Sequence, residues 1–268
     1  MMIELDRGAE PASLKKVRAR ELKRVKAIAQ TIAPSSNDIG TEYQLARRTL
    51  WERQDYKCCF CECKEQHDYN DVEHYRPKAV VKHSKDGATQ PGYWWLAWTW
   101  ANLMFACQSC NRSYKKTWFP LDELSVPLEP LKKPPGLEKP LLINPYEESP
   151  IDHIQFKRVI VEGRRRWIPF ARNLSKKGQW TIEIAGLDRD TLLDLYEDHF
   201  VNFVEPHLIA IQRVINEANP SAIMETWKRE TKRLLNRRQP FAGLSYDALD
   251  AFFPEMRRRL HDLDLARP

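Results

Sequence analysis

The sequence predicts a mainly α-helical α+β fold, in which a small cysteine-rich module lies between N-terminal helices and a C-terminal helical region. Two observations predict this arrangement. Apolar residues recur at three- to four-residue spacing near both ends of the chain, as on amphipathic helices. The middle of the chain lacks this period and holds all six cysteines. We therefore expect three parts, comprising residues 1–56, 57–123 and 124–268.

Length and composition are those of a globular protein. The 268 residues suffice to bury a core, and 43 basic against 37 acidic side chains give a net charge of +6. This charge permits a polyanionic partner without demanding one. No apolar run reaches about 18 residues, and the charged N-terminus lacks the apolar stretch of a secretory signal. We expect a cytoplasmic protein that does not bind membranes.

The N-terminal part should contain two helices. Residues 12–32 carry apolar side chains at helical spacing, and the segment Pro34–Asp38 should end that helix. A second helix is expected over residues 42–54, where it leads into the first cysteines. The positive charge of this part contrasts with residues 51–123, in which ten basic side chains balance ten acidic ones.

The rest of the chain changes character several times. Residues 58–119 are irregular, and residues 121–150 form a proline-rich connection. Residues 155–161 alternate in polarity and predict a strand, with residues 166–170 as its hairpin partner. From residue 176 to residue 263 the pattern is helical, with breaks near Gly186, Pro220, Pro240–Gly243 and Pro254.

The cysteines form two C-x-x-C pairs that predict a zinc site. In a reducing compartment such pairs indicate metal ligands rather than disulfides, and four thiolates suit tetrahedral Zn²⁺. Four ligands leave no open position, so the zinc should be structural. A Cys59/Cys63 pair is possible in principle, and buried cysteines without metal are the alternative interpretation. The expected ligands are Cys58, Cys61, Cys107 and Cys110.

Three further segments accompany these pairs. Glu73 and His74 lie between them, Asn102 precedes the second pair, and Asn111 directly follows it. Each residue alone is a weak signal, but their order around two C-x-x-C pairs resembles the HNH endonuclease family. The resemblance implies a ββα-metal fold with the pattern His74, Asn102, Asn111. Asparagine at the third position is a variation that this family accepts, and Glu73 stands where many members have aspartate.

The chemistry of these residues fits hydrolysis of a phosphodiester bond. With an ordinary pKa near 6.5, His74 can accept a proton from water. The oxygens of Glu73 and Asn111 suit Mg²⁺ or Mn²⁺, which would neutralise charge at the phosphate. Asn102 should fix the loop of His74 through side-chain-to-backbone hydrogen bonds. Because strand neighbours point to opposite faces, Glu73 and His74 can share a site only at an irregular strand end.

Two cations are candidates for phosphate binding. Arg76 could contact a phosphate, although a surface ion pair is an equally good interpretation. Lys115 lies four residues beyond Asn111, one helical turn on, and resembles a lysine that many HNH proteins carry. Lys116 fits plain solvated surface. The aromatic run at residues 93–100 should form core rather than stack on bases.

A closer resemblance extends beyond the HNH residues. Several segments look like the PtuB-type nucleases of bacterial Septu and retron-associated antiphage systems: residues 3–11, 51–54, 58–62, 73–78, 141–145 and 181–187. The resemblance implies an antiphage effector that cuts nucleic acid, which we expect to be DNA. It also implies a partner, an ABC/SMC-like ATPase of the PtuA type.

Two alternatives stay open. The chain could be a zinc-stabilised nucleic-acid-binding or protein-binding module without catalysis. The C-terminal helices could dock a partner, bury the back of the small module, or grip a phosphate backbone through basic clusters that otherwise read as solvated helix faces. These clusters are Arg164–Arg166, Lys232-Arg233, Arg237-Arg238 and Arg257–Arg259.

Overall fold

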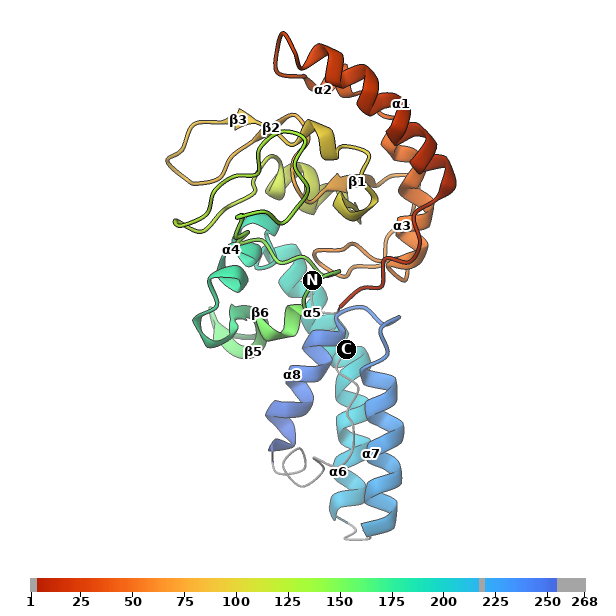
Figure 1. Ribbon diagram of the computed structural model, residues 1–268. Helices are drawn as coiled ribbons and strands as arrows, with labels where there is room; N and C mark the ends of the chain where they lie inside the picture. The colour runs from red at the N-terminus through yellow and green to blue at the C-terminus, as the bar shows by residue number, and fades with distance from the viewer. Residues whose placement is uncertain (1–3, 217–219, 255–268) are drawn as a thin grey trace.

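The computed structural model of the protein describes residues 4–216 and 220–254 (Figure 1). Within them the fold is mixed α+β, as expected, with helices at both ends and three two-stranded antiparallel sheets between them. The cluster Arg257–Arg259 and the end of the expected C-terminal helical region lie outside the described residues. In the described part, no helix combines the length and apolarity that a membrane crossing needs.

The N-terminal helices follow the sequence prediction with one addition. The predicted helix over 12–32 ends four residues early, and the one over 42–54 begins as a 3₁₀ turn. The segment around Pro34–Asp38 follows the first helix and also begins a second, short one. Ser35 and Asp38 form a reciprocal capping box, which starts a single helical turn. The elements are α1 (Ala12–Ile28), α2 (Ser36–Ile39), η1 (Glu42–Ala46) and α3 (Arg47–Arg53).

The cysteine-rich part contains two short sheets. Strand β1 (Asp71–His74) pairs antiparallel with β4 (Leu103–Ala106), so that Glu73 lies opposite Met104. A single π-helical segment, η4 (Ser109–Lys115), follows β4 after a short turn. The second sheet consists of β2 (Val80–Val81) and β3 (Gln90–Pro91), and the 3₁₀ turns η2 (Trp94–Leu96) and η3 (Trp100–Asn102) precede β4.

The aromatic run is core, which confirms the sequence interpretation. Tyr93, Trp94, Trp95, Trp98 and Trp100 are each at least nine-tenths buried. They belong to the hydrophobic core, η2 contacts α1, and Trp98 has no exposed surface. Large rings supply apolar area that a module with so little regular structure would otherwise lack.

The proline-rich segment is largely exposed but is fastened to the core at a few buried residues. It contains no helix or strand between residues 121 and 149, yet Glu138 is buried within it. The Glu138 carboxylate accepts hydrogen bonds from Arg76 Nε at 2.8 Å, from the Tyr93 hydroxyl at 2.5 Å and from the Leu128 backbone at 2.9 Å. These bonds fasten the segment to the cysteine-rich part of the chain.

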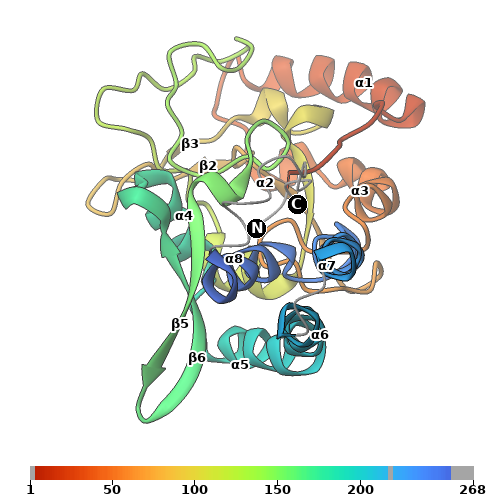
Figure 2. The same cartoon turned by 90° about the horizontal axis from the view of Figure 1, so that it is seen from below.

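The predicted hairpin is present. Strands β5 (Ile154–Val161) and β6 (Arg164–Ala171) pair antiparallel, with Val161 opposite Arg164. Strand β6 therefore begins two residues before the predicted start at residue 166. Gly163 adopts a φ of 77° in the two-residue turn, a conformation that glycine tolerates without strain. Figure 2 shows the hairpin as a twisted ribbon at the edge of the molecule. Along the chain, η5 (Pro150–Asp152) precedes it and η6 (Arg172–Leu174) follows it.

Helices make up the rest of the described chain. The first, α4 (Lys176–Ala185), ends at Gly186 in the left-handed conformation, as the break there predicted. Helices α5 (Asp190–His199), η7 (Phe200–Val204) and α6 (Glu205–Asn216) run on without a break. Helix α7 (Pro220–Leu234) lies beside α6 and forms an arm that points away from the N-terminal half (Figure 1). Helix α8 (Ala242–Phe252) returns to pack on β5.

A buried lysine ties the C-terminal helices to the first cysteine loop. Lys57 Nζ lies 3.1 Å from Glu62 Oε1 and donates hydrogen bonds to the carbonyl oxygens of Arg237 and Gln239, at 2.5 and 2.9 Å. Both members of the ion pair are about 2% exposed. The turn between α7 and α8 is therefore anchored on the loop that carries Cys58 and Cys61.

Candidate functional site

Four buried cysteines form a cluster that fits a tetrahedral metal ion. The Sγ atoms of Cys58, Cys61, Cys107 and Cys110 all lie within 4.8 Å of one another. A zinc ion with bonds of about 2.3 Å to four sulfurs separates those sulfurs by roughly 3.8 Å. The Sγ atoms of Cys61 and Cys107 are 3.9 Å apart, close to that value. The sequence predicted the same four residues.

In each of the two loops that present the cysteines, a backbone amide donates a hydrogen bond to the first cysteine sulfur. The Phe60 amide donates to Cys58 Sγ and the Cys110 amide to Cys107 Sγ, both at 3.4 Å. Such bonds stabilise charge on the sulfur atoms, as metal-bound thiolates require. Cys59 and Cys63 stay outside the cluster, so the geometry favours the predicted Cys58 and Cys61 over the Cys59/Cys63 pair.

Arg189 adds a positive charge that the sequence did not indicate. Its Nη1 atom lies 3.5 Å from Cys110 Sγ and 2.7 Å from the carbonyl oxygen of Gly186. Burial lowers the pKa of Arg189, but the neighbouring sulfur atoms of Cys110 and Cys61 outweigh that effect and raise it above its ordinary value. Since 79 positions separate Arg189 from Cys110, no local pattern could have revealed the contact.

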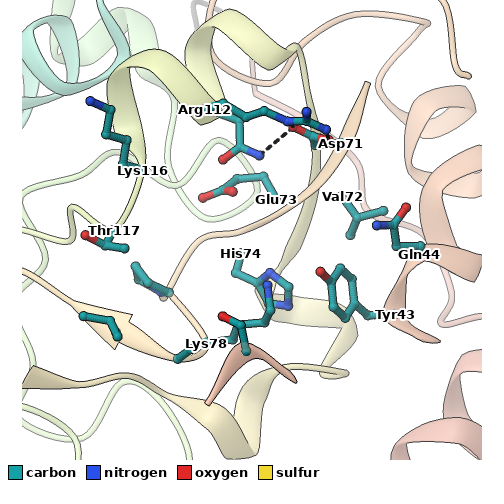
Figure 3. A pocket seen from close by; sticks show the side chains of 15 residues that line it. Tyr43, Gln44, Asp71, Val72, Glu73, His74, Lys78, Arg112, Lys116 and Thr117 are labelled. Carbon is teal, nitrogen blue, oxygen red and sulfur yellow. Dashed lines mark hydrogen bonds and ion pairs between the residues drawn. The ribbon is translucent and has the colours of Figure 1, made fainter. Parts of the chain in front are cut away.

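A separate cavity of about 380 Å³ lies beside β1 and η4 (Figure 3). Glu73 and His74 reach it from β1, and Asn111 reaches it from η4. The structure thus brings together three of the predicted site residues. The other polar side chains that line it include Ser36, Tyr43, Gln44, Asp71, Lys78, Arg112, Lys116 and Thr117.

The ring of His74 is held in one orientation. Its Nε2 atom lies 2.9 Å from the carbonyl oxygen of Ala97, and the ring meets that of Tyr43 edge-on at 4.5 Å. Because a carbonyl only accepts, Nε2 carries the proton and Nδ1 keeps its lone pair. Burial, aided by the charge of Lys78, holds the pKa of His74 well below its ordinary value. His74 is therefore a neutral imidazole at pH 7.

Glu73 and His74 can share the cavity because β1 ends at His74. His74 is the last residue of the strand, which leaves its side chain free of the strict alternation that would send it to the opposite face. Asn102 holds the chain just beyond this point. Its Oδ1 accepts from the Arg76 amide at 2.8 Å and its Nδ2 donates to the Arg76 carbonyl at 3.0 Å.

Lys115 lies beneath the cavity rather than in it. The side chain has no exposed surface, and Nζ pairs with Glu73 Oε1 and donates to the carbonyl oxygen of His74 at 3.0 Å. Burial raises the pKa of Glu73, and the ammonium of Lys115 opposes that rise. The geometry therefore does not support the predicted contact between Lys115 and phosphate.

The π-type geometry of η4 explains this difference. In an α-helix, residue i+4 lies over residue i, which favoured Lys115 as the neighbour of Asn111. Here the Lys116 amide donates to the Asn111 carbonyl at 2.7 Å, an i+5 bond that brings Lys116 back over Asn111 instead. Lys116, expected as plain surface, lines the cavity.

Arg76 also departs from both of its sequence interpretations. The side chain is 5% exposed and pairs with Glu138, which has almost no exposed side-chain surface. Its guanidinium lies 5.4 and 5.3 Å from the ring centres of Tyr75 and Phe119. Arg76 is therefore a core residue, neither a surface ion pair nor a lining residue of the cavity, and we do not propose it as a phosphate ligand.

Sequence reasoning missed four charged residues of the cavity, namely Asp71, Lys78, Arg112 and Lys116. A signal was available for Asp71, because a residue two positions before Glu73 on a strand lies on the same face. No such signal was available for Lys78. It lies four residues beyond His74 in a segment without helical or strand periodicity, so the sequence did not indicate that its side chain reaches the cavity.

Comparisons with known proteins identify relatives. The chain is 33% identical over 200 residues to "Septu protein PtuB" of Bacillus mycoides (strain KBAB4), covering 72% of the chain and 65% of that protein. It is 26% identical over 191 residues to "Septu protein PtuB" of Bacillus thuringiensis, covering 70% and 55%. A third relative is "Septu protein PtuA" of Bacillus mycoides (strain KBAB4), 23% identical over 218 residues, covering 77% and 28%.

The chain therefore spans less than two thirds of the length of each of these relatives. No family model matches the chain, and no solved structure matches it.

Proposed function

The chain is a homologue of the Septu protein PtuB, and from that premise we propose that it is a metal-dependent HNH endonuclease that cuts DNA in antiphage defence. One observation carries the proposal. Glu73 and His74 from β1 and Asn111 from η4 converge on one cavity beside a four-cysteine cluster. A neutral histidine base and two hard oxygen donors are the groups that phosphodiester hydrolysis requires.

The frame of the site supports the ββα-metal assignment. Strands β1 and β4 form the two-stranded sheet, and η4 supplies the helical segment that packs beside it. Cys107 and Cys110 stand at the junction of β4 and η4, so zinc bound by the four cysteines would fix η4 against the first cysteine loop. With four sulfur ligands this zinc is structural.

Glu73, His74, Asn102 and Asn111 each have a role in the proposed reaction. His74 Nδ1 accepts a proton from the attacking water, while the bond from Nε2 to Ala97 keeps the ring in place. The Glu73 carboxylate and the Asn111 amide oxygen form a hard donor set that fits Mg²⁺ or Mn²⁺. When bound, such a cation neutralises charge on the phosphate and stabilises the leaving oxygen. Asn102 fixes the backbone after His74.

Lys78 and Lys116 replace Arg76 and Lys115 as the proposed phosphate contacts. Both line the cavity, and Lys116 is exposed. Lys78 Nζ lies 4.8 Å from the ring centre of Tyr43, at the same wall of the cavity as His74. Their positive charges would attract a phosphate backbone and neutralise part of its charge at the site of cleavage.

A divalent-metal assay on supercoiled plasmid DNA tests the proposal. We expect nicking by the wild-type chain with Mg²⁺ or Mn²⁺ and loss of nicking in Asn111→Ala. The matched control is Asn202→Ala, at an exposed position on η7 that does not line the cavity, and it should cut normally. DNA that is bound but never cut with either cation would contradict the nuclease and favour a non-catalytic zinc-stabilised binding module.

The proposal includes a partner, an ABC/SMC-like ATPase of the PtuA type. The homology to PtuB supports it, and so does the balanced charge of residues 51–123, which leaves DNA binding in need of positive charge from elsewhere. The test is co-purification of the full chain with the product of a neighbouring ATPase gene. No complex, together with full cleavage by the lone chain, would contradict the partner.

A further inference from the structure

Asp71 forms a hydrogen bond with Asn111, one of the two residues proposed to bind the cation. It lies two residues before Glu73 on β1, so both carboxylates leave the strand on the side that faces η4. Asp71 Oδ2 accepts a hydrogen bond of 3.0 Å from Asn111 Nδ2. Asp71, Glu73 and Asn111 all line the cavity, and Figure 3 shows where the side chains of Asp71 and Glu73 lie in it.

The bond settles which way the Asn111 amide points. A carboxylate only accepts hydrogen bonds, so the amide must direct its NH₂ group, and not its oxygen, at Asp71. The oxygen of a planar amide then points away from Asp71, and Asn111 is one of the residues that line the cavity. Within the described residues, Asn111 Oδ1 has no hydrogen-bond donor, which leaves its lone pairs for a cation.

Arg112 holds Asp71 in turn. Its Nε and Nη2 atoms donate to the two carboxylate oxygens at 2.9 and 2.7 Å, in the forked geometry that makes such pairs specific. The Asp71 side chain is 13% exposed, whereas that of Arg112 is 63% exposed. Both oxygens of the Asp71 carboxylate therefore accept hydrogen bonds from Arg112 and Asn111, which favours a role in holding these side chains over a role as a cation ligand.

Asn111 is thus fixed at both ends. Its backbone amide donates to the Cys107 carbonyl at 3.0 Å, within the second cysteine loop, and its side chain is fixed by Asp71. We propose that Asp71, supported by Arg112, is a positioning residue that aims Asn111 Oδ1 at Mg²⁺ or Mn²⁺. This inference rests on the proposed function, because it assigns Asp71 to the same cation site.

The test measures Mn²⁺ affinity by isothermal titration, with the EPR signal of bound Mn²⁺ as a second readout. In zinc-loaded protein, Asp71→Asn should weaken Mn²⁺ binding by about 10- to 100-fold, as loss of a ligand-orienting partner typically does. Asp68→Asn removes the same charge at an exposed position outside the cavity and should leave the affinity unchanged. Zinc content and the urea midpoint report whether each variant is folded.

A double-mutant comparison separates positioning from direct ligation. If Asp71 acts only through Asn111, adding Asp71→Asn to Asn111→Ala should change Mn²⁺ affinity by less than about 2-fold. An undiminished further loss would overturn the inference and make Asp71 a ligand itself. Equal Mn²⁺ affinity of wild type and Asp71→Asn would also overturn it.

Arg112→Gln keeps the inference testable if Asp71→Asn does not fold, because the Arg112 side chain is largely exposed. We expect weaker Mn²⁺ binding in this variant as well. Unchanged Mn²⁺ affinity with weaker DNA binding would overturn the supporting role and make Arg112 a phosphate contact. A wild-type chain that binds no Mn²⁺ would instead contradict the proposed function.

Discussion

Lys115 forms a buried ion pair with Glu73 directly beneath the cavity. The same ammonium donates a hydrogen bond of 3.0 Å to the carbonyl oxygen of His74, so one side chain touches both residues of the Glu73-His74 pair. Lys115 has no exposed surface, and Glu73 is 6% exposed. The pair therefore supplies the positive charge that allows an ionised carboxylate to stand at the cavity wall.

Removing this charge should destabilise the fold. In Lys115→Met the buried Glu73 carboxylate loses its counter-charge, and we expect a loss of about 3 kcal/mol in the free energy of unfolding. Urea denaturation without added Mg²⁺ or Mn²⁺ measures it. Lys116→Met, at the exposed neighbouring position, should change stability by less than about 0.5 kcal/mol. Equal stability of the two variants would show that the ion pair is not needed.

The four-cysteine cluster should bind one zinc ion per chain. Cys107→Ser should lose the metal and unfold, because zinc binding contributes directly to the folding free energy of such sites. Cys59→Ser changes a buried cysteine beside the cluster and should keep its zinc. Elemental analysis and circular dichroism provide the readout. A folded, zinc-free Cys107→Ser protein would be incompatible with a structural zinc.

Lys57 should matter for the attachment of the C-terminal helices. In Lys57→Met, Glu62 remains buried without its partner, and the carbonyls of Arg237 and Gln239 lose their donor. We expect a loss of about 3 kcal/mol and faster hydrogen exchange at the turn between α7 and α8. The exposed Lys64→Met is the control. Unchanged exchange in that turn would mean that Lys57 does not anchor it.

His199 should make stability depend on pH. Burial lowers its pKa to about 4, against about 6.5 for an unfolded histidine. The unfolded chain therefore binds a proton first as the pH falls, and stability drops between about pH 6.5 and pH 4. Between pH 7 and pH 5.5 this group should contribute a loss of about 1 kcal/mol.

His199→Gln should remove that part of the pH dependence, as measured by urea unfolding at the two pH values. The control, His67→Gln, lies on a loop near Trp51 and should retain the wild-type difference. Identical pH dependence in wild type and His199→Gln would exclude His199 as its source.

Local patterns sufficed to predict parts of the fold and the cysteine cluster. The alternation of residues 155–161 and the glycine at position 163 are properties of neighbouring residues, and the hairpin formed where they indicated it. The spacing within each C-x-x-C pair likewise fixes how two sulfurs converge. Both features depend on a few consecutive residues, and this is why the sequence reveals them.

Arg76 and Lys115 show where local patterns stop. The direction of Arg76 is decided by Glu138, which lies 62 positions away in a segment without helix or strand. The direction of the Lys115 side chain is decided by the π-type turn of η4, which holds one residue more than an α-helical turn. In this turn Lys116, and not Lys115, reaches the cavity. Neither a distant buried partner nor a π-type turn leaves a periodic signal in the sequence.

The most direct test of the account is the single-turnover rate of plasmid cleavage by His74→Gln, with Mn²⁺ and with the proposed ATPase partner present. We expect a rate about 10²- to 10⁴-fold below wild type, with unchanged zinc content and urea midpoint. His83→Gln, outside the cavity, should cut at the wild-type rate. A His74→Gln protein that cuts as fast as wild type would contradict His74 as the general base and the cavity as the active site.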